Sequence, residues 1–264
     1  MMRMLIACVA LLLYVSNACA DEVVTLPLRG SVTQSYLLAP ARSSTPKVVA
    51  VMFPGGFGQV HLPADGSVPR IGRRGNFLVR SRDLFRDEDL AVAIIDVPSD
   101  LQASGLSDGM RMSSEHVGDV GKVVSDLRQR FPGTKIMLVG TSRATLSVAY
   151  VARAMGSLID GVVETSTLFA GNARTTSLGG FDWDSIKVPL LFVHHESDSC
   201  WACPYSAAKR LAERYPLITV RGGDPPQSDP CEAMSAHGYI GKEAPTAAAI
   251  RNWMLGRPYS HLIE

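Results

Sequence analysis

Residues 136–150 read IMLVGTSRATLSVAY, and this stretch carries the strongest fold signal in the chain. An apolar strand ends in GTSRA at residues 140–144, and a helix is predicted to begin at once. Small residues are needed on both sides of Ser142, because the strand and helix backbones approach closely at such a turn. The turn would present the Ser142 hydroxyl above the edge of a sheet.

Strand-like and helix-like segments alternate on both sides of this turn. Continuous apolar runs are typical of strands whose two faces are both covered by helices, and the apolar spacing of other segments indicates helices. An opening hairpin is predicted at 23–40, strands at 47–53, 91–95, 135–139, 161–163, 188–193 and 217–220, and helices at 117–131 and 250–254. The pattern predicts an α/β fold with a mainly parallel sheet, whose ligands bind beyond the carboxyl ends of the strands.

The first twenty residues have the layout of a secretory signal peptide. Arg3 is followed by an apolar run over residues 4–15 and by Ala-Cys-Ala at 18–20, which favours cleavage before Asp21. The run is shorter than the roughly twenty residues that span a bilayer. We therefore expect residues 21–264 to form a single domain, exported to the periplasm or outside the cell, without stable membrane insertion. A lipid anchor at Cys19 is a weaker alternative.

The composition limits the partners of the chain. Its 264 residues include 26 Lys and Arg against 25 Asp and Glu, with 46% hydrophobic and 19% charged residues. This is the composition of a folded globular protein, and it argues against nucleic-acid binding through a broad basic surface. Nothing in the sequence requires a metal or an organic cofactor.

A nucleophilic role for Ser142 requires a base to take its proton and an acid to orient that base. In the predicted architecture the base follows both the serine and the acid along the chain, and only His237 and His261 lie late enough for this. His261, three residues from the end, falls in an expected loose tail. His237 lies in a loop before the last predicted helix and is the favoured base. Asp198, just past the strand at 188–193, is the first choice for the acid, and Glu164, after the strand at 161–163, is the alternative.

Negative charge that develops on a substrate oxygen needs fixed hydrogen-bond donors. The backbone amide of Arg143, directly after Ser142, is the first donor expected. The second should come from the glycine-rich turn PGGFG at residues 54–58, where glycine lets the backbone turn its N–H groups inward. Either Gly56 or Phe57 could supply it, and the sequence does not choose between them.

Three cysteines remain once the leader is removed, namely Cys200, Cys203 and Cys231. An odd number in an exported protein indicates one disulfide and one free thiol. The C-x-x-C spacing of Cys200 and Cys203 is also compatible with a redox or metal site. A thioredoxin-type redox motif should follow an early strand, and a zinc site needs a second pair of ligands, but the sequence shows neither context. A bridge between Cys200 and Cys231 is favoured. The adjacent His194 and His195 face opposite sides of a strand and are expected to pack rather than to chelate one ion.

Together, these residues resemble the α/β-hydrolase superfamily of serine esterases, lipases and peptidases over most of residues 45–256. The family pattern Gly-x-Ser-x-Gly is met with Ala144 in the last place. The resemblance implies an eight-stranded, mostly parallel sheet and an acyl-enzyme mechanism. Ser142 would attack a carbonyl, His237 would carry its proton, and Asp198 would hold the imidazole.

The sequence also resembles small secreted bacterial hydrolases whose acid loop reads Asp-x-Cys and whose histidine loop carries a cysteine shortly before His-Gly. Those cysteines correspond to Cys200 and Cys231 here. The resemblance therefore implies a bridge that joins the acid loop to the base loop, with Cys203 left as a thiol.

The expected substrate is a small molecule. Residues 170–187 are too few for a separate cap domain, which favours an open site and a small or extended substrate. Arg70, Arg73 and Arg74 could bind an anionic group, although a solvated charged loop is the simpler interpretation. A carboxylic-ester hydrolase is the leading function and a peptidase or amidase the nearest competitor. A non-catalytic binding protein on the same scaffold is the third, and it predicts that Ser142 and its partners do not converge.

Overall fold

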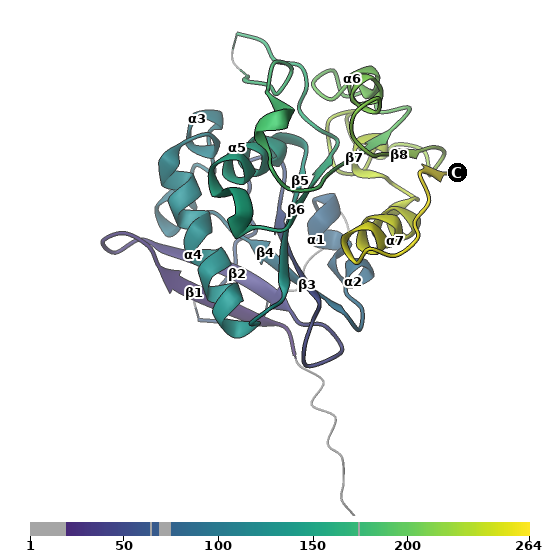
Figure 1. Ribbon diagram of the computed structural model, residues 1–264. Helices are drawn as coiled ribbons and strands as arrows, with labels where there is room; N and C mark the ends of the chain where they lie inside the picture. Colours follow the sequence, from purple (N-terminus) through teal and green to yellow (C-terminus); the bar gives the residue numbers. More distant parts are fainter. Residues whose placement is uncertain (1–19, 64, 69–74, 174) are drawn as a thin grey trace, which may run out of the picture.

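A computed structural model describes residues 20–63, 65–68, 75–173 and 175–264 of the chain (Figure 1). The predicted signal peptide, except Ala20, and the arginines at 70, 73 and 74 lie outside these residues. Within the described ranges, no helix combines the length and the apolar character needed to cross a membrane.

The described residues form one nine-stranded sheet in the order β1-β2-β4-β3-β5-β6-β7-β8-β9. Strands β1 and β2 form the predicted hairpin, and β2 is also antiparallel to β4. All other neighbours are parallel. The predicted α/β fold is confirmed. The strands are β1 (Glu22–Pro27), β2 (Thr33–Ala39), β3 (Val48–Phe53), β4 (Leu90–Ile95), β5 (Lys135–Thr141), β6 (Gly161–Thr165), β7 (Leu190–His195), β8 (Leu217–Val220) and β9 (Leu262–Ile263).

Helices cover both faces of this sheet, as the continuous apolar runs predicted. Every residue of β3, β4, β6 and β7 is buried. One core cluster joins the sheet to α4, α5 and α6, and a second joins its other face to α1, α2 and α7 (Figure 1). The helices are α1 (Phe77–Arg80), α2 (Arg82–Phe85), α3 (Asp108–Arg111), α4 (Ser114–Arg130), α5 (Thr145–Met155), α6 (Tyr205–Leu211) and α7 (Glu243–Met254), with short 3₁₀ helices η1 (Ser99–Leu101), η2 (Ser142–Ala144), η3 (Gly156–Leu158), η4 (Trp183–Ser185) and η5 (Ala236–Gly238).

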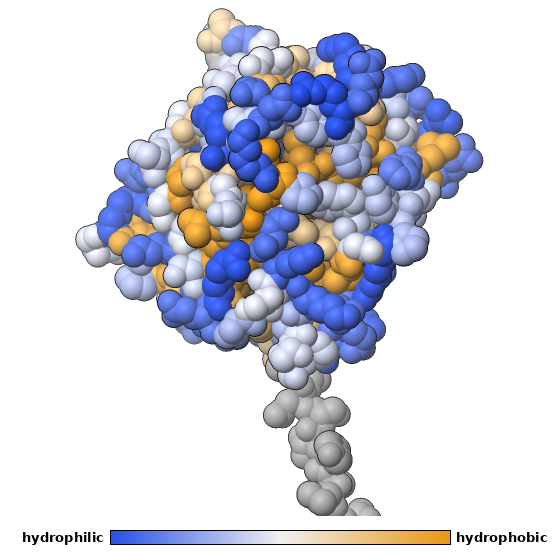
Figure 2. All heavy atoms as spheres, in the orientation of Figure 1, coloured by the Kyte–Doolittle hydropathy of each residue, from blue (hydrophilic) through white to orange (hydrophobic). Residues whose placement is uncertain are grey.

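The sheet has nine strands rather than the eight that the resemblance implies, and the short strand β9 at the end of the chain, which pairs with β8, is part of the difference. The expected loose tail around His261 is instead held against β8: the Thr219 amide donates to the His261 carbonyl at 2.9 Å, and Ile263 is buried. The β8 edge offers unpaired backbone groups, and an apolar residue next to it gains burial by pairing there. On the face seen in Figure 2, hydrophobic side chains show as separate patches among hydrophilic ones.

Candidate active site

The strand-to-helix turn around Ser142 has the conformation that its sequence predicted. Strand β5 passes through η2 directly into α5, and Ser142 has a φ of 55°, a left-handed conformation that a serine rarely adopts. A Cβ placed on Gly140 would lie 2.8 Å from Val148 Cγ2 and 3.1 Å from the Ala144 carbonyl oxygen. The close approach of strand and helix therefore requires the small residue at 140, and the backbone strain is concentrated at the serine.

The glycine-rich turn after β3 packs against the serine turn. A Cβ on Gly55 would lie 2.9 Å from the Thr141 carbonyl oxygen and 3.1 Å from Ser142 Cβ. The turn is closed by a hydrogen bond of 3.1 Å from the Gly58 amide to the Gly55 carbonyl, and Gly56 has a φ of 61°. Within the described part of the chain, neither the Gly56 nor the Phe57 amide donates to an acceptor.

Asp198 and His237 are brought together from two loops. The carboxylate of Asp198, which follows β7, places Oδ2 2.9 Å from His237 Nδ1, and its Oδ1 accepts from the Cys200 amide at 2.9 Å. The Asp198 side chain is fully buried. The other imidazole nitrogen, His237 Nε2, is buried and has no hydrogen-bond partner among the described residues. Ser142 and His237 line the same cavity of about 360 Å³.

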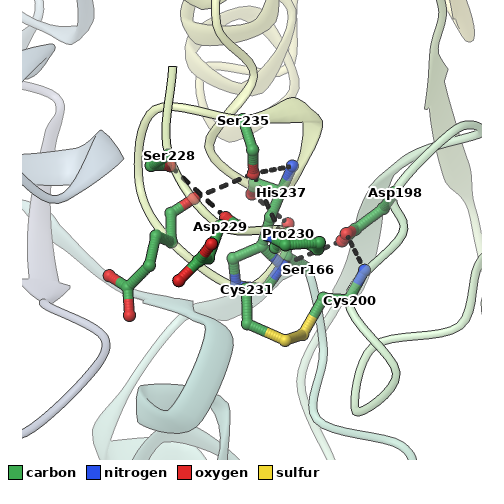
Figure 3. The surroundings of a disulfide bond; sticks show 10 residues. Ser166, Asp198, Cys200, Ser228, Asp229, Pro230, Cys231, Ser235 and His237 are labelled. Carbon is green, nitrogen blue, oxygen red and sulfur yellow. Dashed lines mark hydrogen bonds and ion pairs between the residues drawn. A yellow bond between two sulfur atoms is a disulfide. The ribbon is translucent and has the colours of Figure 1, made fainter. Parts of the chain in front are cut away.

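The loop that carries His237 is held by several hydrogen bonds, drawn in part in Figure 3. Ser235 Oγ accepts from the His237 amide at 3.2 Å, and Ser166 Oγ donates to the His237 carbonyl at 2.8 Å. Gly238 is required by space, because a Cβ there would lie 1.9 Å from the Ala233 carbonyl oxygen. The backbone on both sides of the imidazole is therefore constrained before any substrate binds.

The predicted disulfide between Cys200 and Cys231 is present, and it joins the acid loop to the base loop (Figure 3). Cys203 is a buried free thiol, as expected, and burial raises the pKa of this thiol well above its usual value. Ligand atoms of Cys200, Cys203 and His237 lie within 4.8 Å of one another. Because the disulfide occupies the Cys200 sulfur, this group offers fewer free donors than a structural zinc site uses.

Glu164, the alternative acid, lies within β6, where both of its oxygens are buried and have no hydrogen-bond partner among the described residues. Burial raises the pKa of this carboxyl well above its usual value. The imidazole of His237 instead contacts Asp198. His194 Nε2 accepts from the Thr167 amide at 2.9 Å, and burial lowers the pKa of His194 to about 3, in keeping with the packing role predicted for it.

Two residues near the site carried no functional signal in the sequence. Arg111 is 1% exposed, and its guanidinium donates to the Gly56 carbonyl and to Ser147 Oγ, each at 3.0 Å. Asp108 Oδ1 accepts from Arg143 Nε at 2.6 Å. Both residues belong to α3, a four-residue helix whose sequence shows only an N-cap serine before it. Their partners are far away in the sequence, so no local pattern could reveal them.

Solved structures with the same architecture cover most of the chain. An α/β serine hydrolase without a lid from Xanthomonas campestris is 15% identical, with a TM-score of 0.59 over 90% of this chain and 97% of that one. Est1E from Butyrivibrio proteoclasticus is 14% identical, with a TM-score of 0.60 over 89% and 98%. Dienelactone hydrolase from Anabaena variabilis is 12% identical, with a TM-score of 0.61 over 90% and 98%.

No family model and no curated protein matches the sequence. The structural likeness nevertheless identifies the fold as that of the α/β-hydrolase superfamily.

Proposed function

We propose that this protein is a serine hydrolase that cleaves carboxylic esters through an acyl-enzyme intermediate. One observation carries the proposal. Asp198 engages one nitrogen of His237, and the other nitrogen is left without a partner in the cavity that Ser142 lines. A buried imidazole nitrogen without a hydrogen bond is costly, and a general base that receives a proton from serine is a physical reason for it.

In the first half of the reaction, Ser142 Oγ attacks the ester carbonyl while His237 Nε2 takes the hydroxyl proton. Asp198 accepts from His237 Nδ1, which fixes the tautomer and stabilises the imidazolium. The tetrahedral oxyanion accepts hydrogen bonds from the backbone amides of Arg143 and of the turn at Gly56 and Phe57. As the intermediate collapses, the imidazolium gives its proton to the departing alcohol, and the acyl group stays on Ser142.

In the second half, His237 removes a proton from water, and the resulting hydroxide attacks the acyl carbonyl. Collapse of this intermediate releases the carboxylic acid and returns the proton to Ser142 Oγ. The two halves add up to hydrolysis of one ester by one water. The strained φ of 55° at Ser142 supports the role of nucleophile, because such strain is concentrated where the hydroxyl must be held clear of the backbone.

We also propose that the protein is exported and acts on small substrates that reach an open cleft. The predicted leader at residues 1–20 and the disulfide between Cys200 and Cys231 support an oxidising compartment. The short segment at 170–187 supports access without a separate cap domain. The exposed side chain of Trp201, at the edge of the same cavity, offers an apolar contact for an acyl or alcohol group.

The test is to treat protein that begins at Asp21 with a fluorophosphonate and to locate the adduct by peptide mass spectrometry, with Ser142→Ala as the control. We expect stoichiometric labelling at Ser142, and hydrolysis of short-chain p-nitrophenyl esters that falls by at least about 10³-fold in the control. Parallel assays on matched anilides measure the amidase alternative. Folded protein that is not labelled and does not turn over esters would refute the proposal and favour a binding protein on this scaffold.

A further inference from the structure

Arg111 is a buried charged side chain without a direct ion pair among the described residues. It is 1% exposed, and no carboxylate in the described part of the chain lies within ion-pair distance of it. Burial, together with the nearby charge of Arg143, lowers the pKa of Arg111 to about 9, and the carboxylate of Asp108 opposes this shift. Removing a guanidinium from water costs several kcal/mol, so the position calls for a role that a smaller apolar residue could not fill.

The guanidinium packs against the glycine-rich turn and is hydrogen-bonded to its backbone. Arg111 Nη2 donates to the Gly56 carbonyl at 3.0 Å, and the Leu106 amide donates to the Phe57 carbonyl at 2.9 Å. A Cβ placed on Gly58 would lie 3.1 Å from Arg111 Nη2, so the guanidinium fills the space under the turn. Two successive carbonyl groups of the turn are thus anchored by the segment at 106–111.

Anchoring a carbonyl also orients the next amide. In a trans peptide the C=O of one residue and the N–H of the next point in opposite directions, and the described residues contain no cis peptide. The bond from Arg111 to the Gly56 carbonyl therefore turns the Phe57 N–H away from the guanidinium. Among the described residues, neither this amide nor that of Gly56 has an acceptor, and Gly56 lines the cavity that Ser142 and His237 share. It belongs to the turn that packs against Ser142 Cβ.

The same short helix supports the turn that follows the serine. Asp108, at the first position of α3, accepts from Arg143 Nε at 2.6 Å and from the Thr176 amide at 3.1 Å. Arg111, at its last position, also donates to Ser147 Oγ in α5 at 3.0 Å. Helix α3 thus contacts both backbone segments that supply the oxyanion donors of the proposed reaction.

We propose that Arg111 is a positioning residue for the oxyanion hole, and that by holding the Gly56 carbonyl it fixes the glycine-rich turn whose free backbone amide is the second donor. The inference rests on the proposed function and goes beyond it, because it names a side chain outside the proposed catalytic residues that holds the donor turn in place. Arg111 does not touch the substrate; it acts through the turn.

The test compares Arg111→Met, which removes the bond to Gly56, with Ser147→Ala, which removes the other bond of the same guanidinium. For an ester that the wild type hydrolyses, we expect kcat of Arg111→Met to fall about 10- to 100-fold with KM within about threefold, since a misplaced oxyanion donor affects mainly the transition state. Ser147→Ala should retain kcat within about threefold. Arg111→Lys, which keeps a long cationic donor, should recover part of the loss.

A second readout separates positioning from a general structural effect. An alkyl boronic acid forms a tetrahedral adduct with an active serine, whereas the product acid binds without one. We expect the boronate inhibition constant of Arg111→Met to rise by the same factor as kcat falls, with the product inhibition constant unchanged. If Arg111→Met does not fold, Arg111→Gln, whose shorter polar side chain does not reach Gly56, provides the same comparison.

The proposal is overturned if the folded variant keeps wild-type kcat and boronate affinity. It is equally overturned if boronate and product affinities fall together, because that would indicate a damaged pocket. Failure of the proposed function is distinguishable, since wild-type protein would then be neither labelled at Ser142 nor active on the ester.

Discussion

Removal of the bridge between Cys200 and Cys231 should lower the stability of the protein by an amount that its loop length sets. The two cysteines are 31 residues apart, and the chain-entropy relation gives about 3.7 kcal/mol for a loop of this size at 25 °C. A domain of about 244 residues unfolds with an entropy of about 0.5 kcal/mol/K. The melting temperature should therefore fall by about 7 °C.

The double variant Cys200→Ala/Cys231→Ala is the appropriate perturbation. A single substitution would leave a thiol next to Cys203, and a new bridge could form within the C-x-x-C segment. Differential scanning calorimetry at one scan rate measures the shift. Cys203→Ala is the control, because it removes a buried sulfur without opening the loop, and we expect it to cost about 1 kcal/mol, or about 2 °C.

Activity should respond less than stability. Asp198 and His237 remain bonded to each other, and Ser235 and Ser166 still hold the base loop in the double variant. We expect kcat at 25 °C to fall by less than about tenfold. A melting temperature within about 2 °C of wild type, or equal to that of Cys203→Ala, would show that the disulfide does not stabilise by restricting the unfolded chain.

Three further predictions concern single residues. Ser142→Gly should melt about 2 °C above Ser142→Ala, because glycine adopts the φ of 55° without strain, and equal melting temperatures would contradict this. Asp198→Asn should lower kcat about 10⁴-fold, whereas Glu164→Gln should leave it within about twofold, since the His237 imidazole contacts Asp198 and not Glu164; a large loss in Glu164→Gln would reverse the assignment of the acid. Burial lowers the pKa of His116 to about 3 in the folded protein, whereas in the unfolded chain this imidazole takes up a proton below about pH 6.5. The contribution of the neutral His116 to the free energy of unfolding is therefore full above pH 6.5 and is lost as the pH falls toward 3. Urea unfolding of wild type and His116→Leu should show about 2 kcal/mol of additional wild-type loss between pH 7.5 and pH 5, and parallel pH profiles would refute it.

Much of the architecture could be predicted from local patterns. Apart from Lys47, the runs at 47–53, 91–95 and 188–193 are apolar without interruption, and the corresponding strands β3, β4 and β7 are buried throughout. The turn at Ser142 is equally local, because a few neighbouring residues determine how closely a strand and a helix can approach. The pairing of Cys200 with Cys231 was also predicted, with the resemblance to small secreted hydrolases adding to the cysteine count.

The sequence favoured Asp198 as the acid and left Glu164 as the alternative, and the tertiary structure separates the two. Glu164 and Asp198 both follow apolar strand residues in the sequence, but the register of β6 pairs Glu164 with Gly140 and Phe192 inside the sheet, whereas Asp198 lies past the end of β7. The end of the chain was wrongly predicted to be a loose tail, whereas in the structure it pairs with β8.

Arg111 shows most clearly that local sequence patterns do not reveal contacts between distant segments. Its contacts with Gly56 and Ser147 join positions 55 and 36 residues away, and nothing within its own helix indicates either. Backbone periodicity and turn chemistry depend on neighbours within a few residues, so the sequence by itself determined the alternation of elements, the serine turn and the candidate base. Contacts between distant loops depend on how every intervening element packs, so only the tertiary structure decided which acid meets His237 and which cation supports the glycine-rich turn.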